Sequence, residues 1–243
     1  MTTLYSKSLA QIVNENHKTA YVFEKYHLDF CCKGKRMLQQ ACEEMKVPVE
    51  QVIAELENIT SDSKISVDFD KMSLTQLANY IVLTHHEYIK TELPLIHSYL
   101  QKIASKHGDR HPELLAVFNA FAELQEDLSQ HMEKEEIILF PRIMMVELYS
   151  HDNSEIQTNR SHLESPITVM EQEHENAGDL LAQIRELTNN YNLPLDACTT
   201  YRLAFAALQA FEMDMHQHIH LENNILFPKT IKLFNTLNEI FLN

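Results

Sequence analysis

Two stretches of the chain, His131–Pro141 (HMEKEEIILFP) and His218–Pro228 (HIHLENNILFP), share the pattern H-x3-E-x4-F-P. A His-Glu dipeptide stands at nearly the same distance upstream of each stretch, at His86-Glu87 and at His174-Glu175. The repetition predicts a duplicated helix pair, in which each half supplies one His and then one His and one Glu.

The composition favours helices over other regular structure. The chain has 243 residues with only 3 Gly and 7 Pro, so it offers little of the turn material that a β-sandwich or a loop-rich α/β fold needs. Apolar residues recur at spacings of three and four, the period of a helix with one buried face. They predict long helices near residues 73–105, 112–150, 163–190 and 196–226, with a further helix near 228–242. Long helices with short joins are typical of an antiparallel four-helix bundle, so we predict an all-α fold.

A smaller unit precedes the bundle in the sequence. Residues 1–59 predict short helices near 9–26, 35–45 and 49–59, and Cys31 and Cys32 stand in the turn between the first two. The stretch TSDSKISVDFDK is polar and lacks helical periodicity, which is typical of a linker. We therefore predict a small helical N-terminal domain at 1–59, a linker at 60–71 and the bundle at 72–243.

Six side chains of the duplicated pattern are candidate metal ligands. Residues four apart on a helix differ by about 40° around its axis, so the His and the Glu of each pattern point the same way. In an antiparallel bundle the lone upstream His of each half can face its partner pair across the core. The predicted ligands are His86, His131, Glu135, His174, His218 and Glu222.

Four imidazoles and two carboxylates suit a pair of iron ions, because zinc more often takes thiolates or a closed tetrahedral set. Manganese accepts the same ligand types. An exposed face of His and Glu is the alternative for one such pair, but two copies in matching context favour the metal site. The zinc-hydrolase pattern HExxH is absent from the sequence.

The charge balance excludes two classes of partner. The chain carries 35 acidic and 20 basic side chains, and a net charge of −15 repels nucleic acid and anionic membranes. The sequence has no run of 18 apolar residues and no secretory signal at its start.

The four Cys form no CxxC pair, which fits a reducing compartment, and Cys42 and Cys198 are expected to pack on apolar helix faces. We therefore expect a cytoplasmic protein that binds neither nucleic acid nor membrane.

The doubled pattern, together with DFCCKG at 29–34, resembles the repair-of-iron-centres (RIC) family, the group of YtfE, ScdA and DnrN, over nearly the whole chain. The resemblance implies a hemerythrin-like bundle behind a small N-terminal domain. It implies a non-haem di-iron centre, oxo- and carboxylate-bridged, on the six residues named above. It also implies restoration of clusters damaged by nitric oxide or peroxide, iron–sulfur proteins as clients, and a cytoplasmic, often dimeric protein. The chain differs from the family in having Lys33-Gly34 where Gly-Gly commonly follows the two Cys, and in its extra C-terminal helix.

Three functions are compatible with these residues. The leading hypothesis is a stress protein whose di-iron site supplies or exchanges iron for damaged clusters, with Cys31 and Cys32 as its reactive thiols. Their basic neighbours Lys33, Lys35 and Arg36 favour the thiolate form. One alternative is a di-iron enzyme that reduces nitric oxide or peroxide, and another is a hemerythrin-like sensor of oxygen or nitric oxide. The residues do not decide whether the protein is an enzyme.

Neighbours of the predicted ligands carry weaker indications. His85 points about 100° away from the adjacent ligand and is not expected to bind metal. Glu173 and Asp127 are candidates for hydrogen bonds to ligands. His216 and His220 are expected to be exposed or to lie just outside the ligand set.

Overall fold

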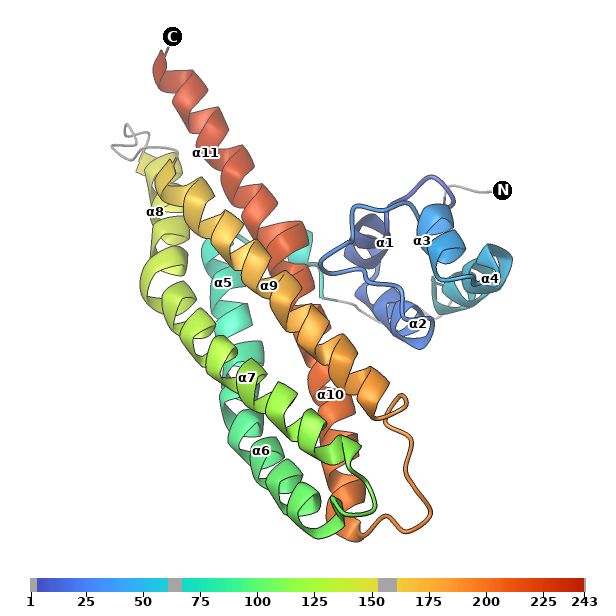
Figure 1. The fold of residues 1–243 in the computed structure, drawn as a ribbon. Helices are drawn as coiled ribbons and strands as arrows, with labels where there is room; N and C mark the ends of the chain where they lie inside the picture. The colour runs from blue at the N-terminus through green and yellow to red at the C-terminus, as the bar shows by residue number, and fades with distance from the viewer. Residues whose placement is uncertain (1–3, 61–66, 153–160, 243) are drawn as a thin grey trace.

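The computed structural model describes residues 4–60, 67–152 and 161–242. Regular structure in these ranges is helical, apart from one isolated β-bridge between Ser8 and Met37 (Figure 1). The prediction of an all-α fold is therefore confirmed. Within the described ranges, no helix is both long enough and apolar enough to cross a membrane.

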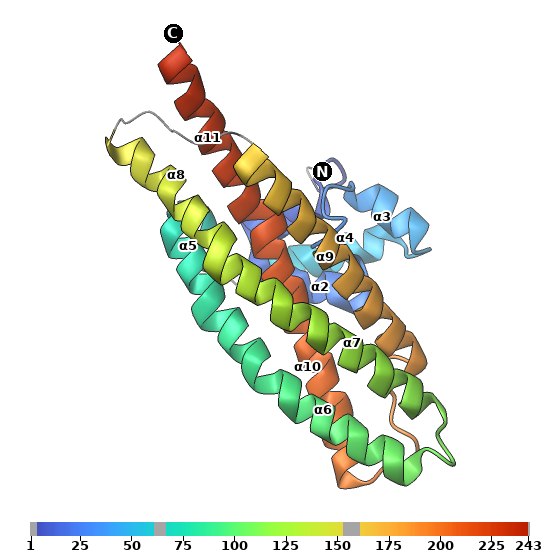
Figure 2. The same ribbon diagram turned by 60° about the vertical axis from the view of Figure 1, so that its left-hand side comes forward.

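Four helical rods form an antiparallel bundle, which Figures 1 and 2 show from two sides. The rods are α5 (Leu74–Ile81) with α6 (Glu87–His107), α7 (Glu113–Lys134) with α8 (Phe140–Asp152), α9 (Ser161–Leu187), and α10 (Thr199–Leu221) with α11 (Phe227–Leu242). Helix α7 packs on α6 and α9, and α6 packs on α10. The joins at 108–112 and 188–198 reverse the chain between rods.

A π-helical turn connects the two helices of each of the three two-part rods. The turns are Val82–His86, Glu135–Leu139 and Glu222–Leu226. In the last of them the N–H of Phe227 bonds to the carbonyl of Glu222, five residues back. Pro228 follows at once, as Pro141 does after the preceding turn, and a proline inside a helix collides with the carbonyl four residues back. The wider π turn relieves this collision, so the rod continues past Pro228 into α11, which is the further helix predicted near 228–242.

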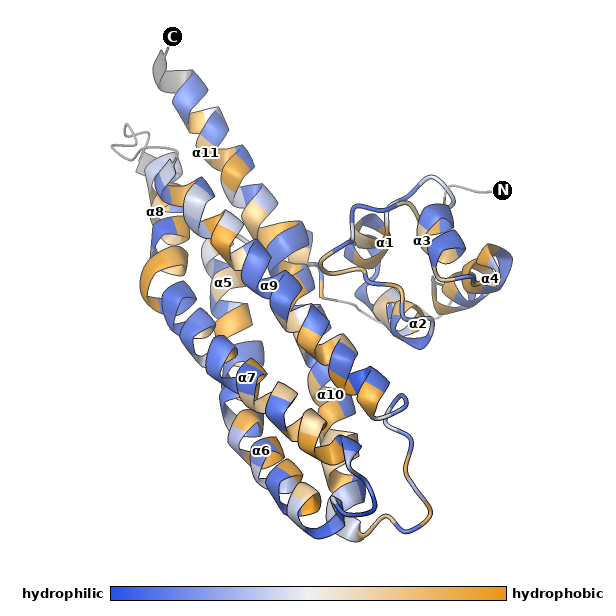
Figure 3. Ribbon diagram, in the orientation of Figure 1, coloured by the Kyte–Doolittle hydropathy of each residue, from blue (hydrophilic) through white to orange (hydrophobic). Residues whose placement is uncertain are grey.

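The core of the bundle consists of two apolar clusters with a polar layer between them. One cluster comes mainly from α6, α7, α9 and α10 and includes Phe121 and Phe211. The other comes from α5, α8, α9, α11 and the last π turn and includes Phe140 and Phe234. Hydrophobic residues recur along every rod between hydrophilic ones (Figure 3), as expected for helices with one buried face. The predicted ligands fall where one cluster gives way to the other.

The N-terminal domain contains four short helices: α1 (Leu9–Glu15), α2 (Ala20–Lys25), α3 (Leu38–Glu44) and α4 (Val49–Thr60). The predicted helix at 9–26 is broken at Asn16, whose backbone is extended (φ −155°, ψ 98°) and whose side chain accepts the N–H of Lys18. This local hydrogen bond starts a 3-10 turn that leads into α2 and competes with a continuous helix. The helix predicted at 35–45 begins only at Leu38.

The end of the predicted linker is packed against both parts of the chain. Residues 61–66 lie outside the described residues, whereas Phe69–Lys71 form a helical turn. The ring of Phe69 lies 5.6 Å from that of His17 and 5.1 Å from that of Tyr80, measured between centroids. The division at 59, 71 and 72 stays a prediction.

The N-terminal domain packs on the bundle at α10 and α9 (Figure 1). His216 donates to Glu24 over 2.7 Å, and His220 Nε2 donates to the side-chain oxygen of Asn14 over 2.8 Å. These contacts hold the thiol turn, which we define as residues 29–34, beside α9. The vicinal cysteines therefore lie close to the bundle in this structure.

Candidate metal centre

All six predicted ligands converge in the polar layer of the bundle. Each of these residues is at most 2% exposed. Their ligand atoms form two sets, and within each set all atoms lie within 4.8 Å of one another. One set is His86, Glu135, His218 and Glu222, and the other is His131, Glu135, His174 and Glu222. Because both sets contain both carboxylates, the arrangement offers two metal positions that share two bridging groups.

The imidazoles pair across the two halves of the repeat. His86 Nε2 lies 3.2 Å from His218 Nε2, and His174 Nε2 lies 3.0 Å from His131 Nε2. The expectation that each lone His faces the pair of its own half is therefore wrong for the imidazoles. This pairing follows from the antiparallel packing of α6 on α10 and of α7 on α9. As a result, each metal position takes one His from each half of the repeat.

Hydrogen bonds on the outer ring nitrogens direct three of the four imidazoles inward. The pairs are His86 Nδ1 with Glu136 (2.8 Å), His131 Nδ1 with Glu173 (2.9 Å) and His174 Nδ1 with Asn223 (2.8 Å). An Nδ1–H that donates outward leaves the Nε2 lone pair free to face the centre, which is the tautomer that a metal requires. Glu173 thus has the expected role, whereas Asp127 is exposed. The fourth imidazole, His218, has no hydrogen-bond partner on Nδ1.

The charge of the centre fits a pair of cations. Both carboxylate oxygens of Glu135 and of Glu222 are buried, and the two carboxylates face the Nε2 atoms of the four imidazoles at 3.0–3.4 Å and accept no other hydrogen bond from the described residues. A buried carboxylate is strongly disfavoured unless it is paired or binds a metal. Burial lowers the pKa of His131, but the carboxylates of Glu135 and Glu173 outweigh this effect and raise that pKa to about 10. The two shared carboxylates and the four inward-facing imidazoles therefore form a donor set that bound cations would stabilise.

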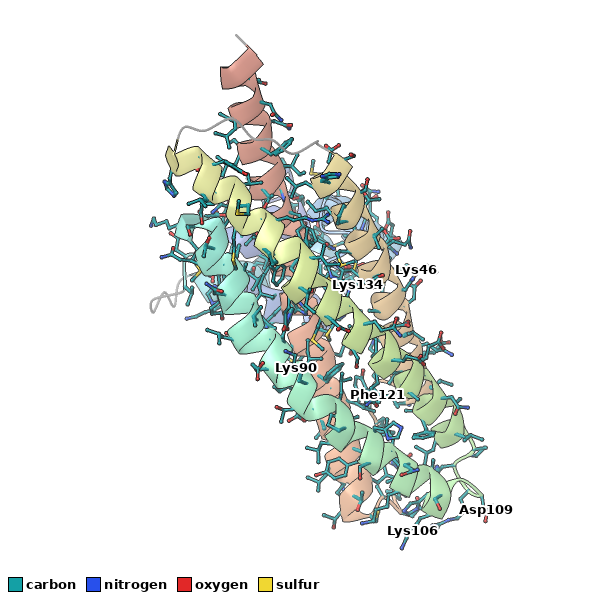
Figure 4. The ribbon with its side chains drawn as sticks, turned by 90° about the vertical axis from the view of Figure 1, so that its left-hand side faces the viewer. Lys46, Lys90, Lys106, Asp109, Phe121 and Lys134 are labelled. Atoms are coloured by element: carbon teal, nitrogen blue, oxygen red, sulfur yellow. The ribbon has the colours of Figure 1, made fainter. Side chains whose placement is uncertain are left out.

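One side of the centre is close to the surface. A hollow of about 230 Å³ is lined by Lys134 and Glu173 and reaches His131 and His174. Lys134 Nζ lies 2.5 Å from Glu173, so an ion pair between α7 and α9 lines this opening, and Figure 4 labels Lys134 beside α7. The metal position of His131 and His174 therefore borders a hollow at the surface.

The structure explains two features of the sequence pattern that sequence reasoning did not interpret. The π turns begin at Glu135 and at Glu222, the two predicted bridging residues, and π turns are frequent at functional sites. The Phe of each F-P pair stacks on the lone His of its own half. Centroids lie 5.7 Å apart for Phe140 on His86 and 6.2 Å apart for Phe227 on His174. The equal spacing from His131 to Phe140 and from His218 to Phe227 is the sequence signal that could have indicated a role for the Phe.

His85 is buried next to the centre but belongs to neither ligand set, as expected. Its ring stacks on His218 with centroids 5.7 Å apart and an interplanar angle of 7°. Its Nδ1 donates to Asp214 over 3.0 Å. The residue therefore packs against a predicted ligand from outside.

The surroundings of Cys31 do not favour the thiolate that its basic neighbours suggest. Their sulfurs lie 3.7 Å apart, with Cys31 buried and Cys32 half-buried. The hydrogen bond with Cys32, and then burial, raise the pKa of Cys31 well above its usual value. The basic neighbours do not offset these effects at Cys31, since Lys33 is exposed and Arg36 pairs with Glu44. A hollow of about 460 Å³ opens beside both sulfurs.

Three further residues differ from expectation. His220 is buried and His216 is half-buried, because the N-terminal domain covers this face of α10. The sequence repeat gives no sign of this domain contact. Cys198 is exposed, with its sulfur 3.3 Å from His107 Nε2, whereas Cys42 is buried as expected.

Comparisons with known proteins agree with the two parts of the fold. A family model described as hemerythrin HHE cation binding domain matches residues 77–230, and ScdA_N, a domain of unknown function, matches residues 5–60. The iron-sulfur cluster repair protein YtfE of Yersinia pseudotuberculosis serotype O:1b (strain IP 31758) is 31% identical over 227 residues. That match covers 93% of this chain and 97% of the relative. The protein of the same name from Yersinia pestis (strain Pestoides F) is 30% identical over equal shares of both chains.

The cation-binding family model covers the ligand-bearing helices, and the YtfE relatives match both the bundle and the N-terminal domain. The chain therefore belongs to the hemerythrin HHE cation-binding family and, over nearly its whole length, to the repair-of-iron-centres family of the iron–sulfur cluster repair proteins YtfE.

Proposed function

We propose that this protein holds two iron ions on the six predicted ligands and repairs damaged iron–sulfur clusters by supplying or exchanging iron. The observation that carries the proposal is the pair of buried carboxylates, Glu135 and Glu222, which are shared by two ligand sets and face only the imidazoles of those sets among the described residues. The name of the relatives, iron-sulfur cluster repair protein, supports the use of that iron. Iron–sulfur proteins are then its clients.

The residues of this chain divide the work of such a centre. Glu135 and Glu222 would be shared by the two ions, each pair of imidazoles would hold one of them, and Glu136, Glu173 and Asn223 fix the orientation of three rings. The bound iron supplies the ion that a damaged cluster has lost. The opening beside Lys134 supports release from the His131–His174 position, because a ligand of the client can approach there without unfolding the bundle.

The repair proposal is tested by restoring an enzyme. A hydro-lyase whose [4Fe–4S] cluster has lost one iron to peroxide is mixed with the ferrous-loaded chain, a reductant and a chelator that captures free iron. We expect activity to return with the loaded wild-type chain. A chain with Glu135→Ala and Glu222→Ala, loaded in the same way, is expected to restore none, because it cannot hold the iron to deliver.

The control for this assay is the same amount of ferrous salt under the same chelator. Equal recovery from the salt, or no recovery from the loaded chain, contradicts repair by supplied iron. The assay repeated on a cluster damaged by nitric oxide tests the nitrosative part of the proposal.

The finer parts of the proposal are a cytoplasmic location, a homodimer and the domain division at 1–59, 60–71 and 72–243. All four cysteines are free, which suits a reducing compartment. On the outside of the bundle Ile137, Ile138 and Met145 are exposed and line a hollow of about 420 Å³. An apolar patch of this kind supports contact with a second copy.

The mass in solution tests the dimer. Light scattering is expected to give twice the chain mass of 28.3 kDa, and Ile137→Asp is expected to bring it to the mass of one chain. The carboxylate of the new Asp would be buried in the interface without a partner, so this single substitution is expected to separate the two chains. A wild-type chain with the mass of a monomer contradicts the dimer.

A further inference from the structure

A second cluster of metal-ligating groups lies in the thiol turn, outside the bundle centre. One carboxylate oxygen of Asp29 and the sulfurs of Cys31 and Cys32 all lie within 4.8 Å of one another. Cys31 Sγ is 3.3 Å from Asp29 Oδ1 and 3.7 Å from Cys32 Sγ. We propose that these three residues form a separate binding site for a divalent cation such as Fe²⁺ or Zn²⁺.

The backbone of the turn arranges these groups in advance. Asp29 Oδ1 accepts the backbone N–H of Cys31 (3.2 Å), Cys32 (2.9 Å) and Lys33 (3.3 Å). Three such bonds hold the chain in a loop around the carboxylate and keep both thiols on its side. Asn224 of the π turn Glu222–Leu226 donates to the carbonyl of Cys31 over 2.9 Å, so the loop is also fixed to the bundle. A site that is already folded loses little conformational entropy when the ion binds.

The donor set suits a borderline cation with an open coordination position. Thiolates favour iron and zinc over magnesium or calcium, and the carboxylate adds a hard oxygen. Three protein ligands leave a fourth tetrahedral position free, which is the arrangement of sites that exchange a ligand. The hollow of about 460 Å³ beside both sulfurs gives that position room for an incoming group.

Binding at this site is an exchange of protons for metal. The ion takes both sulfurs as thiolates, two S–H bonds break, and two protons go to solvent, with no change of oxidation state. Affinity for the ion therefore falls as the pH is lowered.

The site lies against the helix that carries a bundle ligand. Cys32 Sγ is 3.6 Å from the carbonyl oxygen of His174, to which its S–H donates, while the imidazole of His174 points into the bundle. Gly178 stands one turn further along α9, and a β-carbon there would lie 3.7 Å from the same sulfur. This position makes the thiol site a stopping point for iron between the bundle and a client. That role rests on the proposed function, whereas the metal site itself does not.

Cobalt(II) titration of the full-length chain tests the site. A Co²⁺ ion bound by thiolate gives an intense near-ultraviolet charge-transfer band, which the nitrogen and oxygen ligands of the bundle cannot give. We expect this band to saturate at one ion per chain in the wild type and in the double variant Glu135→Ala, Glu222→Ala. Cys31→Ser and Cys32→Ser are expected to lose it. Asp29→Asn is expected to weaken cobalt binding by more than about tenfold. Loss of a residue that only hydrogen-bonds to a metal ligand already lowers metal affinity by about tenfold or more, and Asp29 is proposed as a ligand itself.

Matched variants separate metal binding from folding. Asp29→Asn keeps an amide oxygen that can accept the three backbone N–H groups, and Cys198→Ser removes an exposed thiol elsewhere on the chain. Both are expected to keep the wild-type melting temperature, and Cys198→Ser is expected to keep the band. A wild-type chain with no thiolate band, or a band that survives both Cys31→Ser and Cys32→Ser, overturns the thiol site. Absence of iron from the bundle together with an intact thiolate band would overturn the proposed function alone.

Discussion

The double variant Glu135→Ala, Glu222→Ala is expected to lose both iron ions that the wild-type chain binds. Each carboxylate belongs to both ligand sets, so removing the pair deprives each metal position of two of its four groups. It also removes the buried negative charge that attracts the cations. Iron per chain, measured by elemental analysis and by the visible spectrum, is expected to fall from two to near zero.

The metal-free double variant is expected to fold at least as well as the metal-free wild type. Without cations the two buried carboxylates face the imidazoles of the predicted ligands, whose Nε2 atoms lie 3.0–3.4 Å away, and they accept no other hydrogen bond from the part of the chain that the structure describes. Replacing both by Ala removes buried charge that is paired only when those imidazoles are protonated. Glu212→Ala is the matched control, because Glu212 is also a buried carboxylate on α10 but accepts the hydroxyl of Tyr191 over 2.9 Å. We expect this control to keep its iron. Iron that stays bound in the double variant contradicts the bundle site.

Phe211→Ala is expected to lower the free energy of unfolding of the metal-free chain by about 3–5 kcal/mol. Phe211 is 0% exposed, and its ring meets that of Phe121 edge to face with centroids 5.8 Å apart. Both belong to the apolar cluster of α6, α7, α9 and α10, and Figure 4 labels Phe121 within that end of the bundle. Urea unfolding followed by circular dichroism measures the loss. Metal is left out because an ion that binds only the folded chain adds its own stabilisation.

Leu115→Ala serves as the comparison for this variant, because Leu115 on α7 is 58% exposed. Its effect is expected to stay within about 0.5 kcal/mol. Phe211→Ala is expected to keep its iron, since Phe211 belongs to the apolar cluster and its ring packs on Tyr88 and Phe121. A destabilisation below about 1 kcal/mol would show that this part of the core can collapse around the missing ring.

Much of the centre could be predicted from the sequence because helices translate spacing into direction. The four-residue step from His131 to Glu135, repeated from His218 to Glu222, places each pair on one helix face whatever the rest of the chain does. The duplicated pattern then identified the upstream residues His86 and His174 as the remaining candidate ligands. The scarcity of glycine and the helical period of the apolar residues similarly determined the all-α class.

The partners across the bundle could not be predicted in this way. Spacing along one helix says nothing about which neighbouring helix lies opposite, so the pairing of His86 with His218 and of His131 with His174 emerged only from the packing of the rods. The raised pKa of Cys31 has the same origin. Local sequence shows its basic neighbours, but burial and the actual direction of each charge decide its ionisation.

By itself, then, the sequence determined the helical class, the duplication and the six side chains that face the polar layer, because these depend on local periodicity. Tertiary structure alone decided three other things: how the imidazoles are shared between two positions, how the N-terminal domain covers His220, and how Asp29 meets the two thiols. Each of these is a contact between side chains or segments whose relative direction is set by packing and turn geometry. Periodicity along the chain carries no record of such contacts.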